Sequence, residues 1–244
     1  KRQQEVRAPQ NEIDPIFDEF GFEYATAGRI ADQSGLDRMN EICRIKGRAG
    51  VGLLSALPVI DKRYGLPGLA EDVDSGRWIE ADVKTPQGYT VTVVCVYVHA
   101  GNTDDPEKMK QKYRFLDTML VRMGQLRDEA AHGGKQAVLC GDFNIAHTPL
   151  DIKNAKANET HAGFLPEERA YVDKWLGELE FVDVMRNLAG DIQGPYTWWS
   201  QRGRAFDNNV GWRIDYQFAT PELAETARGF VIDKAPTYDL RWSD

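Results

Sequence analysis

The most informative stretch of this 244-residue chain is Val138-Leu139-Cys140-Gly141-Asp142-Phe143-Asn144-Ile145-Ala146-His147. An apolar strand is predicted to run into the glycine, after which Asp142 and Asn144 project from the same side of the extended chain. A carboxylate and an amide side by side at a strand end can hold an attacking water and a phosphate oxygen together, which phosphoryl transfer requires. The alternative interpretation is a simple Asx turn that ends a strand.

Outward from this stretch, the pattern of apolar residues predicts both strands and helices. Short runs rich in β-branched and aromatic residues predict strands at residues 51–54, 78–83, 89–98, 137–140, 212–218 and 229–232. Apolar residues at steps of three and four predict a helix at residues 106–130 and a second one that begins at Pro166. Alternating strands and helices indicate an α/β fold, and we expect a single domain over residues 1–244 because no linker divides them.

The composition is that of an ordinary globular protein, with 42% hydrophobic and 28% charged residues. No apolar run approaches the roughly 20 residues that span a bilayer, so we expect no membrane association. The three cysteines, Cys43, Cys95 and Cys140, are irregularly spaced and favour neither a disulfide framework nor a zinc site. We therefore expect a protein of the reducing cytoplasm.

The net charge of −8 argues against a polybasic DNA binder, whose affinity would come from a generally positive surface. It is compatible with a nucleic-acid enzyme, because a magnesium site needs clustered carboxylates and phosphate contacts need only a local basic face. Two loops offer such a face, although scattered solvated charges are an equally weighted alternative. The basic residues of these loops are Arg44, Lys46, Arg48, Arg202, Arg204 and Arg213.

Further carboxylates stand out by position. Asp215 lies in an otherwise apolar run, where a carboxylate needs a partner or a metal. An ion pair with Arg213 or with a nearby strand explains it as well as a catalytic role does. Glu5, near the start of the chain, and Asp244, at its end, would attract no notice by themselves.

Short motifs in a fixed order along the chain resemble those of one family. They are Gln4-Glu5-Val6-Arg7, Gly47-Arg48-Ala49-Gly50-Val51-Gly52, Val96-Tyr97-Val98, Gly141-Asp142-Phe143-Asn144, Leu150-Asp151-Ile152-Lys153-Asn154, Ala162-Gly163-Phe164-Leu165-Pro166-Glu167-Glu168-Arg169, Tyr196-Thr197-Trp198-Trp199, Gly211-Trp212-Arg213-Ile214-Asp215 and Ser243-Asp244. Each motif is weak alone, but their common order makes coincidence negligible. The chain thus resembles exonuclease III and the AP endonucleases, within the DNase I-like endonuclease/exonuclease/phosphatase superfamily.

The resemblance implies a four-layered α/β sandwich of two packed mixed β-sheets flanked by helices. It also implies a monomeric DNA repair nuclease that acts on duplex DNA with abasic sites or 3′ blocks, as AP endonuclease, 3′→5′ exonuclease or 3′-phosphatase. The alternatives are a phosphatase of the same superfamily that acts on lipid or inositol phosphates, and a catalytically inactive DNA-binding relative. Tyr97, the GFLPEER stretch and the GWRID stretch favour the nuclease.

The resemblance assigns Mg²⁺, with Mn²⁺ as its substitute, to Glu5, Asp142, Asn144 and Asp244. Asp142 would activate the attacking water, and Asn144 would hydrogen-bond the phosphate. Tyr97 would steady a phosphate oxygen or the leaving group. Asp244 would orient the histidine that follows it in the family, and Asp215 would support the site.

DNA recognition is implied in the loops. Trp198, Trp212 and Ile214 resemble the family's pocket for a flipped deoxyribose that lacks its base. Core packing is the alternative for each Trp, and above all for Trp199. The resemblance also implies contacts with the DNA backbone and one side chain inserted beside the lesion. The backbone contacts fall on Arg48, Asn154, Asn158 and His161, and the inserted side chain is Arg202.

The sequence departs from the family pattern in two ways. After Tyr97 it reads Val98-His99-Ala100-Gly101, where relatives usually have Pro and a polar amide, which puts a phosphate contact there in question. The family's first strand, with its Asn, has no counterpart before Glu5, and no His follows Asp244. We expect the complete protein to carry both, and residues 1–244 alone to be insoluble or inactive.

Overall fold

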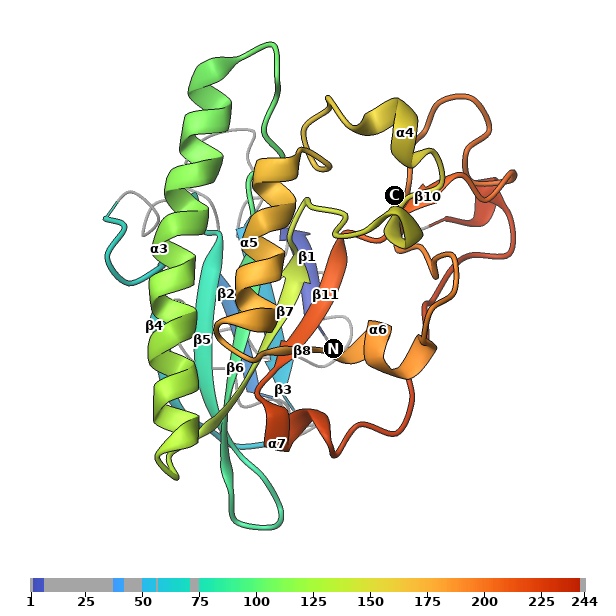
Figure 1. Ribbon diagram of the computed structural model, residues 1–244. Helices are drawn as coiled ribbons and strands as arrows, with labels where there is room; N and C mark the ends of the chain where they lie inside the picture. Colours follow the sequence, from blue (N-terminus) through green and yellow to red (C-terminus); the bar gives the residue numbers. More distant parts are fainter. Residues whose placement is uncertain (1, 7–36, 42–49, 56, 71–74, 242–244) are drawn as a thin grey trace. The chain divides into compact units, whose positions relative to one another are not determined.

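The computed structural model describes residues 2–6, 37–41, 50–55, 57–70 and 75–241 (Figure 1). The chain divides into two compact units. The first unit comprises Lys1–Tyr97 and Val121–Gly141, and the second comprises Val98–Leu120 and Asp142–Asp244. Strands and helices alternate along the described chain, which confirms the predicted α/β class.

The first unit contains a three-stranded sheet. Its order is β1 (Arg2–Val6), β3 (Gly50–Ser55) and β2 (Asp37–Glu41), and both outer strands run antiparallel to β3. The predicted strand at residues 51–54 is therefore confirmed as part of β3. Neither β1 nor β2 was predicted as a strand, because each carries several polar residues.

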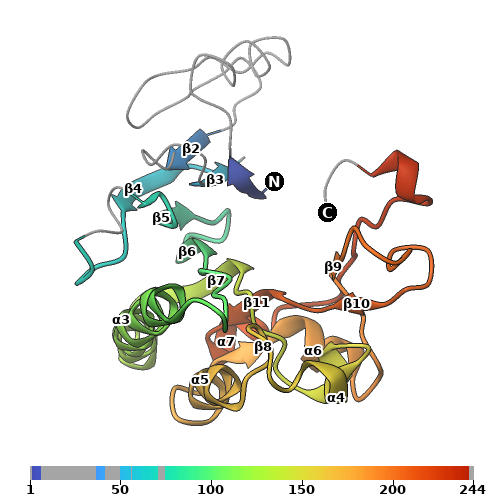
Figure 2. The same ribbon diagram turned by 90° about the horizontal axis from the view of Figure 1, so that it is seen from above.

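Four further strands of the first unit lie side by side in the order β4 (Val59–Tyr64), β5 (Trp78–Lys84), β6 (Thr90–Tyr97) and β7 (Gln136–Asp142). Figure 2 shows the three-stranded sheet on one side of β5 and β6. Apolar side chains of the two sheets form a shared buried core, in which burial supplies the main stabilising free energy. Its buried members are Val51, Leu53, Ile79, Ala81, Val83 and Cys95.

The other face of β5 carries buried carboxylates. Glu80 is fully buried and binds the guanidinium groups of Arg63 and Arg122 at 2.9 and 2.7 Å. Asp82, which is 3% exposed, accepts hydrogen bonds from Arg63 and Lys135. Buried carboxylates are tolerated when they are paired in this way. Arg63 lies on β4, whose charged sequence hides it from prediction as a strand.

The close approach of β6 and β7 depends on a glycine. A Cβ atom at Gly141 would lie 1.8 Å from the carbonyl oxygen of Val96, a separation that no side chain tolerates. Because Gly141 has no Cβ, the backbone of β7 can press against β6 immediately before Asp142. Gly141 therefore allows β7 to pack closely against β6 at the point where the strand reaches the Asp142 carboxylate.

Helix α3 (Pro106–Ala131) confirms the predicted helix almost to the residue. Its buried positions recur at steps of three and four, as an amphipathic helix requires. They are Met109, Lys112, Phe115, Leu116, Met119, Met123, Leu126 and Ala130. Lys112 is the one charged residue among these buried positions, and its side chain is fully buried.

The second unit holds two short antiparallel strand pairs, β8 (Val182–Asp183) with β11 (Asp215–Ala219), and β9 (Trp198–Trp199) with β10 (Gly211–Trp212). Its complete helices are α4 (Ala155–Asn158), α5 (Pro166–Gly177), α6 (Val184–Ala189) and α7 (Pro221–Ala224), with 3-10 turns at Pro149–Asp151 and Tyr238–Leu240. The predicted helix start at Pro166 is confirmed.

An aromatic cluster forms the core between α5 and β11. The rings of Phe143 and Phe218 meet edge to face with centroids 5.0 Å apart, and Tyr216 stacks on Phe218 at 4.8 Å. Trp175 of α5 contacts both phenylalanines. Aromatic contacts of these geometries add to the burial of apolar area. Phe143, which lies between Asp142 and Asn144, is thereby anchored in the core.

Two strand predictions need correction. The predicted strand at residues 212–218 is divided, because Arg213 and Ile214 separate β10 from β11. The predicted strand at residues 229–232 is wrong, since this segment has no regular structure. Its Val231 is 83% exposed and its Ile232 packs against a loop cluster, so the apolar run is not part of a sheet. No helix among the described residues is long and apolar enough to cross a membrane.

Candidate active site

The Asp142 carboxylate and the Asn144 amide are joined directly at the end of β7. Asp142 Oδ1 accepts a hydrogen bond from the Asn144 backbone N–H at 2.7 Å, and Oδ2 accepts one from Asn144 Nδ2 at 3.1 Å. The Asx turn that was considered as an alternative is therefore present, because the Asp142 side chain accepts the backbone N–H of Asn144. It is compatible with chemistry, because an ionised carboxylate has about four acceptor positions and Asn144 uses two.

Asn144 itself is held in an uncommon conformation. Its φ angle is +50°, in the left-handed region that asparagine tolerates better than most residues. Besides the contact with Asp142, its Nδ2 donates to the carbonyl oxygen of Val98 at 2.9 Å. Both amide hydrogens are therefore used inside the protein. The group that Asn144 offers to a ligand is its side-chain carbonyl oxygen, which suits a metal or a water better than a phosphate.

Backbone hydrogen bonds connect this turn to the other motifs of the second unit. Val98 N–H donates to Asp142 O, and Phe143 N–H donates to Ile214 O, both at 2.8 Å. Ala146 N–H donates to Gly163 O, also at 2.8 Å. The Asp142 turn, the GWRID stretch and the GFLPEER stretch are distant in sequence, and these bonds bring them together.

Asp215 begins β11 and is half-buried. Its backbone N–H and that of Ile214 both donate to Thr197 Oγ1 at 3.1 Å. The suggested ion pair between Asp215 and Arg213 is wrong, because the Arg213 guanidinium instead binds the carboxylates of Asp151 and Asp183. An ion pair with Arg213 therefore does not explain the presence of Asp215 in this strand.

The Arg213 ion pairs form a buried scaffold beneath the motif. Arg213 and Asp151 are both fully buried, and Arg186 contacts the same Asp151 oxygen at 2.6 Å. Burial alone would raise the pKa of Asp151, but Arg213 and Arg186 together hold it below its usual value. Arg213 was a candidate for a basic DNA-binding face, and its burial excludes that role.

Three predicted pocket residues lie together. The rings of Trp198 and Trp212 meet edge to face with centroids 6.3 Å apart, and both pack against a buried cluster that contains Ile214. Phe164 belongs to the same cluster. Both Trp side chains are only half-buried, so part of an apolar surface stays open. Trp199, by contrast, is 4% exposed, which agrees with the alternative of core packing for this residue.

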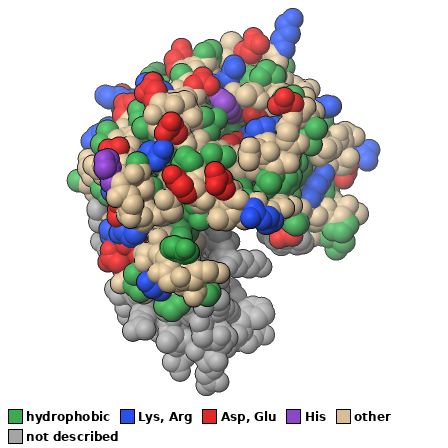
Figure 3. Space-filling model, turned by 60° about the horizontal axis from the view of Figure 1, so that its bottom comes forward, with side chains coloured by type: hydrophobic (Ala, Val, Ile, Leu, Met, Phe, Trp, Pro, Cys, Tyr) green, Lys and Arg blue, Asp and Glu red, His purple; other side chains and the backbone are tan. Residues whose placement is uncertain are grey.

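The polar residues predicted to contact DNA lie on the surface of the second unit. Asn154, His161 and Arg202 are exposed, and Asn158 is half-buried. Asn158 Nδ2 donates to Asn154 O at 2.8 Å across the short helix α4. Figure 1 shows α4 close to β10, the strand that carries Trp212. On the face seen in Figure 3, basic and acidic side chains are interspersed.

Tyr97 ends β6 in the first unit and is half-buried. The Arg77 guanidinium lies 4.6 Å from the centre of its ring, and Arg77 Nη1 donates to Tyr97 O at 3.1 Å. A guanidinium on an aromatic face is an attractive electrostatic contact. Sequence reasoning missed Arg77, and only its position directly before the buried Trp78 could have drawn attention to it.

The sequence pattern of the Endonuclease/Exonuclease/phosphatase family matches residues 4–244, which include every motif described above from Gln4-Glu5 to Ser243-Asp244. The chain belongs to the endonuclease/exonuclease/phosphatase family.

Individual relatives within this family specify its branch. An exodeoxyribonuclease of Bacillus subtilis (strain 168) is 34% identical over 199 residues, which are 82% of this chain and 72% of that protein. An AP endonuclease structure from Archaeoglobus fulgidus has a TM-score of 0.73 and 28% identity, covering 92% of this chain and 77% of that one. A 3′-phosphatase from Neisseria, solved with product DNA hairpin, has a TM-score of 0.72 and 25% identity, covering 93% and 77%.

These likenesses confirm the exonuclease III and AP endonuclease branch of the endonuclease/exonuclease/phosphatase family, with its DNase I-like α/β fold. They identify the chain as a nuclease hydrolase. The enzymes of this branch are metal-dependent nucleases.

The predicted metal ligands of this family member are only partly described. Glu5 lies in β1, but its side chain is outside the described part of the chain, as are Asp244 and the DNA-contact candidate Arg48. Within the described residues no group of three or more His, Cys, Asp or Glu side chains could hold a metal. Asp142 and Asn144 supply oxygen donors, which fit a hard divalent cation.

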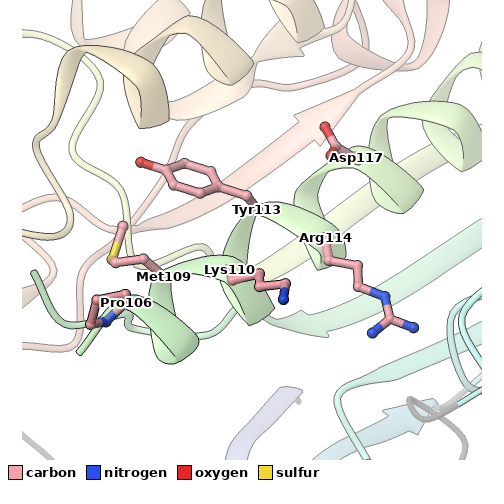
Figure 4. Close-up of a pocket in the computed structure, with 6 residues that line it drawn as sticks. All are labelled: Pro106, Met109, Lys110, Tyr113, Arg114 and Asp117. Atoms are coloured by element: carbon pink, nitrogen blue, oxygen red, sulfur yellow. The ribbon is translucent and has the colours of Figure 1, made fainter.

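A pocket also lies along α3 (Figure 4). Its volume is about 560 Å³, and its lining residues are Pro106, Met109, Lys110, Tyr113, Arg114 and Asp117. None of the predicted catalytic or DNA-binding residues lines it.

Proposed function

We propose that the protein is a Mg²⁺-dependent DNA repair nuclease that hydrolyses phosphodiester bonds 5′ to abasic sites and at 3′ ends. The observation that carries the proposal is the Asp142–Asn144 pair, joined by backbone hydrogen bonds to the segment that bears the half-exposed Trp212. A carboxylate that accepts a proton and an apolar surface that accepts a bare sugar are two of the elements that such a reaction needs.

In the proposed mechanism, Asp142 accepts a proton from the water that attacks phosphorus. Its carboxylate lies at the end of β7, where it accepts the two hydrogen bonds from Asn144. Tyr97 steadies a phosphate oxygen or the leaving group, and Arg77 fixes the position of the phenol ring. Asp215 supports the site from the start of β11.

In this proposal, the residues that would hold the metal are Glu5, Asp142, Asn144 and Asp244. A bound divalent cation would supply positive charge to offset the charge that develops on the phosphate and the departing oxygen. We propose Mg²⁺ as the physiological ion and Mn²⁺ as its substitute, because all four side chains offer oxygen ligands. The Asn144 carbonyl oxygen is suited to this task, since both amide hydrogens are used elsewhere.

DNA binding in this proposal divides between an apolar pocket and polar backbone contacts. Trp198, Trp212 and Ile214 accept the flipped abasic sugar, which the open part of their cluster supports. The exposure of the polar side chains supports the rest, since phosphate contacts require accessible donors. Arg48, Asn154, Asn158 and His161 would contact the DNA backbone, and Arg202 would lie beside the lesion.

We further propose that both units belong to one endonuclease/exonuclease/phosphatase domain, supported by the family match over residues 4–244. A monomer in the cytoplasm is the proposed state. Among the described residues, Cys95 and Cys140 form no disulfide, which is consistent with a reducing compartment.

The experiment uses the full-length protein on three DNA duplexes: one with an abasic site, one with blunt ends and one with a 3′-phosphate. We expect cleavage of the abasic duplex with Mg²⁺, loss of cleavage in EDTA, and recovery when Mg²⁺ or Mn²⁺ is restored in excess. Cleavage that persists undiminished in EDTA would overturn the metal assignment. Hydrolysis of sphingomyelin or inositol phosphates in preference to every DNA substrate would overturn the proposed function.

A further inference from the structure

Lys112 is a fully buried cation on a helix face that is otherwise apolar. It lies three residues after Met109 and three before Phe115, both of which are buried. An ammonium group withdrawn from water costs several kcal/mol unless its hydrogens are all bonded. Its burial therefore calls for specific partners.

The Lys112 ammonium has three polar neighbours within the second unit, two carbonyl oxygens and one carboxylate. Nζ donates to Asn144 O at 2.9 Å and to Ala100 O at 3.1 Å, and it lies 2.5 Å from Glu168 Oε1. Asn144 is the amide of the proposed site, and Ala100 belongs to the turn that follows Tyr97. The ammonium thus joins two loops of the site to α3.

Glu168 extends this connection to a third segment. Its Oε2 accepts hydrogen bonds from the backbone N–H groups of Gly163 and Leu165 at 2.6 and 3.0 Å. Gly163 in turn accepts the N–H of Ala146 and packs near the ring of Trp212. The GFLPEER motif thereby supplies the counter-charge of the lysine that holds the loop bearing Asn144.

The turn at Ala100 and Gly101 packs closely against the Lys112 side chain. A Cβ atom at Gly101 would lie 2.7 Å from Met109 Sδ and 3.1 Å from Lys112 Cδ, and its φ angle is +77°. The backbone therefore approaches the lysine stem more closely than another residue would allow. The two carbonyl oxygens that Lys112 binds, those of Ala100 and Asn144, both belong to tight turns.

We propose that Lys112, paired with Glu168, is a positioning residue for catalysis, which holds the Asn144 carbonyl so that the Asp142–Asn144 pair keeps its geometry. This inference rests on the proposed function of that pair. The argument is local: Asn144 has a left-handed backbone, and such a conformation persists where surrounding contacts fix it. Lys112 provides the buried contact to its carbonyl oxygen.

Electrostatics act in the same direction as the hydrogen bonds. Burial is the largest effect and leaves the pKa of the Lys112 ammonium below its usual value, although the nearby carboxylates of Glu168 and Asp142 raise it. The cation therefore interacts with Asp142, although it is hydrogen-bonded to the adjacent loop. Removing it would alter both the shape and the field of the site.

The test compares three variants of the full-length protein: Lys112→Met, Glu168→Gln and the double variant. Glu168→Gln removes the counter-charge and one of the two acceptor oxygens, while the two carbonyl partners of Lys112, Asn144 O and Ala100 O, remain; we expect lower thermal stability and a smaller loss of single-turnover rate than in Lys112→Met. Lys112→Met should lower both quantities, with a rate loss of roughly 10- to 100-fold. The double variant, which leaves no buried charge unpaired, should regain stability but not rate.

Rates are measured on the abasic duplex at a temperature at which circular dichroism shows each variant folded, and DNA affinity is measured separately in EDTA. Lys110→Met is the matched control, because Lys110 is exposed on the same helix; its rate should equal that of the wild type. A double variant with a rate within about twofold of wild type overturns the proposal. So does a loss confined to DNA affinity, or a failure of both Lys112 variants to fold.

The wild-type protein and Asp142→Asn are assayed alongside as references. If the wild type cleaves no DNA substrate, the proposed function fails. If the wild type is active, Asp142→Asn is inactive and the Lys112 variants keep their rates, then the positioning inference alone fails.

Discussion

The Arg213 guanidinium lies 2.6 Å from the Asp151 carboxylate, and both side chains are fully buried. Arg213 stands in sequence between Trp212 and Ile214, two walls of the proposed sugar pocket. Its side chain points away from that pocket surface into an ionic core that also contains Asp183. Neighbouring side chains of an extended segment point in opposite directions. Trp212 and Ile214 therefore face the proposed pocket, while Arg213 between them stabilises the core.

Replacing Arg213 by Met should destabilise the protein by about 3–5 kcal/mol, because the buried Asp183 would lose the Arg213 cation and the buried Asp151 would keep only Arg186. Urea denaturation followed by circular dichroism measures this loss. Arg204→Met serves as the control, since Arg204 has an 81% exposed side chain and its loss should change stability by less than about 0.5 kcal/mol. Equal stability of the two variants would contradict the scaffold role.

Asp142→Asn should lower kcat by at least ~10²-fold while DNA binding is retained. The substitution removes the proton acceptor, and it also leaves one of the two Asn144 donors without an acceptor oxygen. Single-turnover cleavage and fluorescence anisotropy measure the two properties. Asp173→Asn is the charge-matched control on an exposed carboxylate and should be neutral for kcat. Near-native turnover of Asp142→Asn would show that another group activates the water.

Trp212→Ala should reduce incision at abasic sites more than removal of a 3′-phosphate, because only the first reaction needs a pocket for a flipped sugar. The ratio of the two kcat/KM values is the measurement. Trp199→Ala is the contrasting variant: its buried ring packs on Phe206, so both activities should fall together with stability. The same uniform loss in Trp212→Ala would identify Trp212 as a core residue only.

The pH dependence of stability should depend on Asp82. Burial raises the pKa of this carboxyl, but hydrogen bonds from Arg63, Lys135 and Thr92 together lower it by more. The pKa of Asp82 in the folded protein is therefore about 2. A lowered folded pKa means that the stabilisation is complete above the unfolded pKa of about 3.8 and is lost as the pH falls towards 2. Its size is on the order of 1 kcal/mol, after allowance for solvent screening.

The measurement is the free energy of unfolding of the wild type and of Asp82→Asn between pH 7 and pH 2.5. The difference between the two proteins should be constant at neutral pH and should narrow below pH 4. Other carboxyl groups titrate in both proteins and cancel in the difference. A difference that does not change over this range would show that Asp82 has an ordinary pKa in the folded state.

Much of the fold was predictable because it depends on local patterns. The helix α3 and the strands β5, β6 and β7 follow from periodic apolar residues, and the Asp142–Asn144 pair follows from a strand end. The strand predicted at residues 229–232 failed because a short apolar run does not reveal whether a partner strand is beside it. The Trp198–Trp212 contact was anticipated only through the family resemblance.

The ionic contacts beneath the site were not predictable from the sequence. The partners of Arg213 come from residues 62 and 30 positions away, so no local spacing could identify them. Lys112 did leave a signal, since it is a charged residue at a position that the helix period assigns to the buried face. Lys112 breaks the apolar pattern of the buried helix face, and residues that break such a pattern are candidates for a functional role.

Gly141 sets a limit on how this site can change. Since the carbonyl oxygen of Val96 occupies the place that any Cβ would take, a saturation library at position 141 should return glycine alone among active clones. Directed evolution of new specificity must therefore leave this strand end unaltered and draw its variation from exposed residues such as Arg202 and Asn154. The reactive centre and the substrate-reading surface are in this sense separately evolvable parts of one protein.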